Sequence, residues 1–78
     1  MAEILHRDKR ERFLSLANKR VNRAIKEIAL VGNLSNRRNY DYSEEEARKI
    51  IRTLQSELDR VKQNFRVETE LQRKKFEI

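Results

Sequence analysis

Residues 32–43 read Gly-Asn-Leu-Ser-Asn-Arg-Arg-Asn-Tyr-Asp-Tyr-Ser, and they separate two long stretches that contain neither glycine nor proline. Because glycine and proline interrupt helices most strongly, each stretch can form one continuous helix. One connection between two helices of similar length favours an antiparallel hairpin. The sequence therefore predicts an all-α, coiled-coil-like domain over 1–78, with helices at about 3–31 and 44–75 and a loop at 32–43.

Both predicted helices carry an apolar stripe, and in the first helix the spacings alternate between three and four residues. The first stripe contains Leu14, Ala17, Val21, Ala24, Ile28 and Val31, and the second contains Ala47, Ile50, Ile51, Leu54, Leu58, Val61 and Phe65. This spacing places each set on one side of its helix, where another helix can pack. A chain of 78 residues with 37% hydrophobic content builds only a small core. We therefore expect two copies to pair into a helical bundle.

The two ends of the connection carry different signals. Gly32 is expected to end the first helix in a left-handed conformation. Ser43 and Glu46 have the spacing of a capping box, in which each side chain binds the other residue's backbone N–H. Tyr42 precedes this cap and is expected to be structural, packing against Ala47. Capping and the helix dipole explain the run of three glutamates at 44–46 better than a metal site or an acid–base site does.

The net charge of +6 is concentrated in the first half of the chain. Residues 1–31 hold eight Lys and Arg against four Asp and Glu, whereas residues 44–78 hold nine against eight. Opposite the first apolar stripe, helical geometry gathers Lys9, Arg12, Lys19, Arg20, Arg23 and Lys26 within an arc of roughly 120°. A basic face of this kind is typical of proteins that bind polyanions or acidic surfaces, although it also occurs as a simple solvated face.

The loop and the outward apolar residues are further candidate contacts. Arg37, Arg38 and Tyr40 combine phosphate-binding and stacking groups, a mixture that suits looped nucleic acid or a protein hot spot. The alternative is that the loop is only a turn closed by its own Asn and Ser side chains. Five outward apolar residues are candidates for an oligomer interface: Leu5, Leu16, Leu30, Val67 and Leu71.

Several classes of function are disfavoured. The chain has no cysteine and a single histidine, His6, so we expect no metal site, no cofactor and no catalytic triad. A two-helix hairpin also lacks a pocket that could exclude water, and we therefore expect no enzyme activity. No apolar run approaches the roughly 18 residues that a membrane span needs, and the N-terminus lacks a signal peptide, so we expect a cytoplasmic protein.

The segment Gly32-Asn33-Leu34-Ser35-Asn36-Arg37-Arg38-Asn39-Tyr40, with the acidic helix start that follows it, resembles a segment of small helical proteins from bacterial mobile elements. The resemblance covers roughly residues 19–65 and implies a small accessory or regulatory protein of a plasmid or phage, with no established activity. In architecture alone, the expected fold is also similar to plasmid RNA-binding hairpins of the Rop type, which pair into four-helix bundles.

Three hypotheses follow for function. The first is a non-catalytic regulator, a homodimer that binds DNA, RNA or a nucleoprotein through its basic face and loop. The second is a protein-binding inhibitor or adaptor, such as an anti-CRISPR-like inhibitor of a host nuclease. The third is a structural oligomerisation module whose charge is incidental. The basic excess favours the first, because most proteins that block a nucleic-acid channel are acidic.

Overall fold

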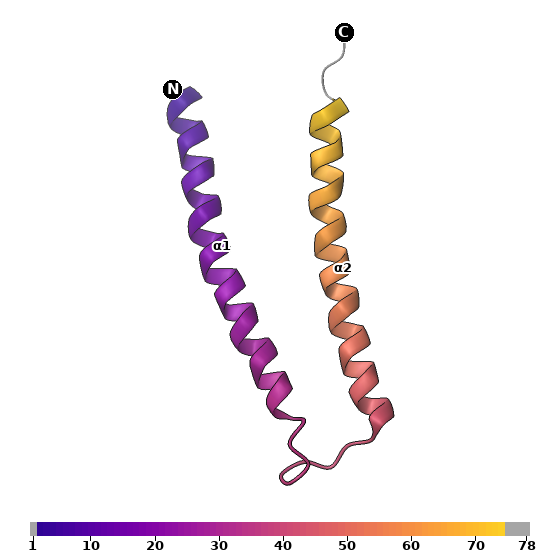
Figure 1. Ribbon diagram of the computed structural model, residues 1–78. Helices are drawn as coiled ribbons and strands as arrows, with labels where there is room; N and C mark the ends of the chain where they lie inside the picture. The colour runs from indigo at the N-terminus through magenta and orange to yellow at the C-terminus, as the bar shows by residue number, and fades with distance from the viewer. Residues whose placement is uncertain (1, 75–78) are drawn as a thin grey trace. The chain divides into compact units, whose positions relative to one another are not determined.

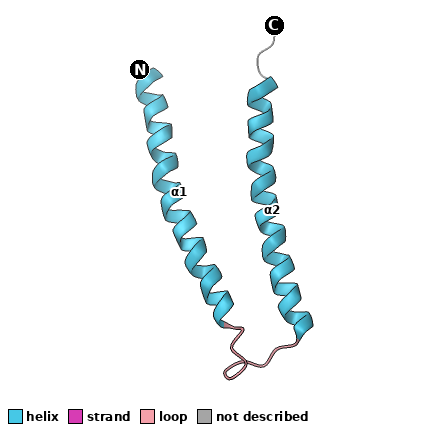
Figure 2. Cartoon of the chain, in the orientation of Figure 1, coloured by secondary structure: helices cyan, strands magenta, loops and turns pink. Residues whose placement is uncertain are grey.

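In the computed structural model, the backbone is described for residues 2–74 and the side chains for residues 8–73. This part of the chain contains two helices and no strand: α1 (Ala2–Asn33) and α2 (Glu44–Lys74), joined by residues 34–43 (Figures 1 and 2). The all-α prediction is therefore confirmed. The predicted end of the second helix at residue 75 lies outside the described residues.

The chain divides into two compact units, Met1–Asp41 and Tyr42–Ile78. The first unit contains α1 with 32 residues, and the second contains α2 with 31 residues. At 1.5 Å per residue, each helix is about 48 Å long. Each unit is thus one long helix with part of the connecting segment, and its properties follow from the two faces of that helix.

The end of α1 differs from the prediction. Gly32 lies inside the helix and does not have a positive φ, so the expected left-handed residue is wrong. The helix ends instead in three bonds of the tighter i→i+3 type, in which the N–H groups of Leu34, Ser35 and Asn36 donate to the carbonyls of Val31, Gly32 and Asn33 at 3.0, 3.1 and 3.4 Å. These bonds satisfy carbonyls that a left-handed glycine would otherwise help to satisfy. The loop accordingly begins at residue 34.

Asn36 organises the rest of the loop. Its carbonyl accepts hydrogen bonds from the N–H groups of Asn39 and Tyr40, both at 3.0 Å. Its side-chain Oδ1 accepts a third bond, from the N–H of Arg38 at 3.0 Å. An asparagine side chain that accepts from the backbone two residues on is an Asx-turn, which mimics a backbone turn. The expected closure of the loop by its own polar side chains is therefore confirmed at Asn36.

The start of α2 follows the sequence prediction closely. The N–H of Ser43 donates to Glu46 Oε1 at 2.8 Å, and the N–H of Glu46 donates to Ser43 Oγ at 3.0 Å. The first helical bond runs from the N–H of Ala47 to the carbonyl of Ser43 at 3.1 Å. These reciprocal bonds form the predicted capping box and fix α2 to begin at Glu44. Tyr42 and Ala47 are both partly buried, which agrees with a structural role for Tyr42.

No side chain among residues 8–73 is fully buried. The apolar stripe of α1 is partly covered only at Ala17 and Val31, and in α2 the side chains of Ile51 and Phe65 are 62% and 61% exposed. Since burying apolar surface is the main force that stabilises folded proteins, both stripes are surfaces that need a partner. Neither α1 nor α2 contains a stretch long and apolar enough to cross a membrane.

Candidate nucleic-acid interface

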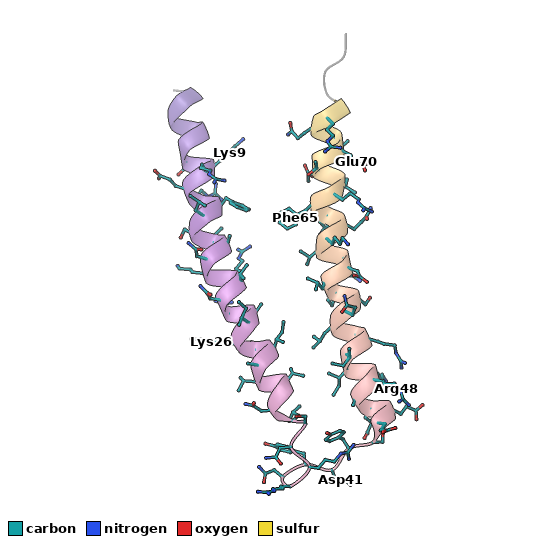
Figure 3. All side chains as sticks on the ribbon, in the orientation of Figure 1. Lys9, Lys26, Asp41, Arg48, Phe65 and Glu70 are labelled. Atoms are coloured by element: carbon teal, nitrogen blue, oxygen red, sulfur yellow. The ribbon has the colours of Figure 1, made fainter. Side chains whose placement is uncertain are left out.

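The basic face of α1 consists of six side chains, Lys9, Arg12, Lys19, Arg20, Arg23 and Lys26. Because α1 is continuous from Ala2 to Asn33, all six project within the predicted arc of roughly 120°. Lys9 and Lys26, which are labelled in Figure 3, bound this face along the helix. They are separated by about 26 Å at 1.5 Å per residue. The helix therefore collects the predicted cations into one long basic strip.

The cations of this face have no ion-pair partner in the part of the chain whose side chains are described. Two ion pairs occur there, and both lie in α2: Arg48 Nη1 with Glu44 Oε2 at 3.9 Å, and Arg60 Nη2 with Glu57 Oε2 at 3.6 Å. In α1, Glu27 is the main acid within the basic arc, and no ion pair joins it to a neighbour. Among the side chains described, the cations of α1 therefore form no ion pair, whereas Arg48 and Arg60 of α2 each form one.

A further cation of α1 has a different role. Arg10 lies over the ring of Phe13, with its Cζ 6.0 Å from the ring centroid. This distance is at the outer limit of a cation–π interaction. This contact was not predicted from the sequence, although residues three apart on a helix are neighbours on its surface. Arg10 therefore belongs with the apolar side of α1 rather than with the basic face.

Two leucines interrupt the basic face. Leu16 is 37% exposed and Leu30 is 58% exposed, and both lie within the same arc as Arg12 and Arg23. On α2, Val67 and Leu71 are also exposed and lie on a face turned by more than about 90° from its apolar stripe. The side chain of Leu5, the fifth candidate for an oligomer interface, lies outside the described residues. The structure therefore places these candidates on two separate helices and leaves each described one accessible.

The loop candidates differ from one another in accessibility. Tyr40 is 47% exposed, and Arg38 is also exposed while its backbone N–H is held by Asn36. Arg37 takes part in an interaction within the protein. Arg38 and Tyr40 are consequently the loop side chains best placed to meet a partner.

Among the described residues, no group of three or more His, Cys, Asp or Glu side chains is placed to hold a metal ion. Comparisons of this chain with protein-family models, with curated proteins and with solved structures find no match. The resemblance to mobile-element proteins stays an expectation.

Proposed function

We propose that this protein is a non-catalytic nucleic-acid-binding regulator that uses the basic face of α1. The observation that carries the proposal is the set of six cations on one side of a continuous helix, without ion-pair partners among the described side chains. Nucleic acids carry one of the densest arrays of negative charge in the cell. Each phosphate that such a cation neutralises releases a counterion, and this release drives binding at low salt.

The loop supplies a second contact in this proposal. Arg38 offers a planar guanidinium for phosphate, and Tyr40 offers an exposed ring for stacking. The turns of the loop are closed by Asn36 and by the i→i+3 bonds after α1. The loop backbone therefore loses little conformational entropy when a partner binds to it. The loop would then extend the contact beyond the end of α1.

We also propose that the two apolar stripes cover each other in an antiparallel hairpin. One register places the small residues Ala24 and Ala17 of α1 opposite the large residues Ile51 and Leu58 of α2. The same register places Glu11 opposite Lys62 at the border of the two stripes. Large-to-small pairing and opposite charges both favour this alignment. A loop of ten residues, 34–43, is long enough to connect helices in this way.

The function is tested by binding of labelled duplex DNA, duplex RNA and single strands, measured by fluorescence anisotropy over a series of salt concentrations. The variant replaces two cations of the basic face, Arg20→Gln and Lys26→Gln. The control removes the same charges and residue types from α2, Arg66→Gln and Lys49→Gln. All four side chains are exposed, so both proteins are expected to fold like the parent.

We expect the α1 variant to reduce the slope of log affinity against log salt by about two, or about one for each lost phosphate contact. The α2 control is expected to leave the slope nearly unchanged. Equal losses in the two variants would show that only net charge matters and would contradict the role of α1. If none of the probes binds, the proposal fails and the protein-partner hypothesis takes its place.

A further inference from the structure

We infer that the ligand of the α1 basic face is duplex DNA of the B form, contacted in its major groove. This inference rests on the proposed function and adds the class of nucleic acid. It starts from the order of side chains across the face. Lys19 and Lys26 lie at one edge of the arc beside Asp8. Lys9 and Arg20 lie at the other edge beside Glu27, so cations outnumber acids at both edges. The centre between these edges is occupied by Arg12, Leu16, Arg23 and Leu30.

This order matches the cross-section of a major groove. The groove of B-form DNA is about 12 Å wide and admits an α-helix, which is about 10–12 Å across with its side chains. A helix lying in the groove has a phosphate backbone on each side and base edges in front of it. Cations at both edges of the arc therefore meet the two backbones, while the central residues face the bases.

The central side chains have the chemistry to contact base edges. Arginine can bind guanine O6 and N7 with two hydrogen bonds, and apolar side chains can contact the methyl group of thymine. Arg23 and Arg12 have no ion-pair partner among the described residues, and Leu16 and Leu30 are exposed between them. Contact with thymine methyl groups would remove the exposed apolar surface of these two leucines from water, which favours binding.

Two other kinds of nucleic acid fit this face less well. The major groove of A-form duplex RNA is deep and narrow, and side chains do not read it. Single strands are bound mainly by aromatic residues on which bases stack. The basic face contains no aromatic residue, because Phe13 projects from the side of α1 that carries the apolar stripe and Tyr40 lies in the loop, outside this face. Helix geometry and composition therefore both favour a DNA duplex.

The test compares three labelled duplexes with the full chain at moderate salt: DNA, RNA of the same sequence, and DNA with glucosylated hydroxymethyl groups on C5 of its cytosines. The C5 position faces the major groove, so these groups obstruct it while the phosphates stay in place. We expect the protein to bind unmodified DNA at least about tenfold more tightly than duplex RNA or glucosylated DNA. With these two duplexes, only the phosphate contacts remain.

Matched variants locate the groove contact on the protein. Arg23→Gln, at the centre of the face, is expected to lose most of the preference for unmodified over glucosylated DNA. Lys26→Gln, at the edge, is expected to weaken binding to both DNA duplexes equally and to reduce the salt slope by about one. Both side chains are exposed on the same helix, so the two variants differ mainly in whether the lost cation lies at the centre or at the edge of the basic face.

Equal affinity for the plain and glucosylated DNA, with a steep salt dependence, would overturn groove binding and leave the proposed function standing. Tighter binding to duplex RNA would also overturn the inference. If the protein binds none of the three duplexes but binds single strands, the inference is overturned and the proposed function stands. If it binds neither duplexes nor single strands, both are overturned.

Discussion

Gly32 shows how a single residue can carry a misleading signal. It is followed by polar residues typical of a turn, yet it occupies a helical position in α1 and does not have a positive φ. The residues after it supply three successive i→i+3 bonds, which end the helix without a left-handed residue. A glycine near the end of a helix predicts a left-handed cap only when no other group satisfies the last carbonyls, and this condition is difficult to read from sequence.

The helical position of Gly32 makes a stability prediction. A Cβ added at Gly32 meets no atom within 4 Å, so Gly32→Ala introduces no clash. Alanine in a helix is favoured over glycine by about 0.5–1 kcal/mol because it loses less backbone entropy on folding. We expect Gly32→Ala to raise the free energy of unfolding by about this amount. Urea unfolding followed by far-UV circular dichroism measures the change.

The reverse substitution Ala29→Gly provides the control, because Ala29 is an exposed position of the same helix. It is expected to lower the free energy of unfolding by a similar amount, about 0.5–1 kcal/mol. A Gly32→Ala protein that is less stable than the parent would contradict the helical assignment, or would show that a partner approaches the α1 stripe closely at this point.

At the scale of the element, the two helices show which signals are local enough to predict. The start of α2 was predictable to the residue because Ser43 and Glu46 contact each other within one turn. The basic face of α1 was predictable because it follows from helical geometry alone. The absence of ion pairs among residues 8–33 of α1 was harder to predict, since acids and bases occur in both helices and the pairing depends on their spacing.

The capping box gives a prediction for α2. Ser43→Ala removes the acceptor for the N–H of Glu46, and a lost cap of this kind costs about 1 kcal/mol of stability. Ser43→Asp keeps an acceptor at the cap and is expected to cost much less. Thermal unfolding at equal protein concentrations compares the two variants. If Ser43→Ala and Ser43→Asp behave alike, the hydrogen bond is not what stabilises the start of α2.

At the scale of the whole molecule, the exposed leucines of α1 separate a nucleic-acid contact from an oligomer interface. The double substitution Leu16→Lys and Leu30→Lys adds two charges within the basic face. If this face binds nucleic acid, the mass measured by light scattering is unchanged, whereas the affinity for unmodified duplex DNA falls because the two apolar contacts to base edges are lost. If the leucines join two copies, the same substitution splits the assembly because it buries charge at an apolar contact. Unchanged binding together with a halved mass would contradict our assignment.

The proposed hairpin register is tested by reversing one pair of charges. In the proposed register, Glu11→Lys or Lys62→Glu alone would place like charges opposite each other, whereas the double variant would restore an opposite pair. Exposed ion pairs contribute about 0.2–1 kcal/mol, so a double-mutant cycle of unfolding free energies should give a coupling of about 0.5 kcal/mol. The control cycle combines Glu11→Lys with Arg52→Glu. Because Arg52 lies away from the α2 stripe, the changes in unfolding free energy of these two substitutions should be additive. If the first cycle shows no coupling between the Glu11 and Lys62 substitutions, the proposed register is contradicted. A stability that rises with protein concentration assigns the pair to two different copies, because pairing within one chain does not depend on concentration.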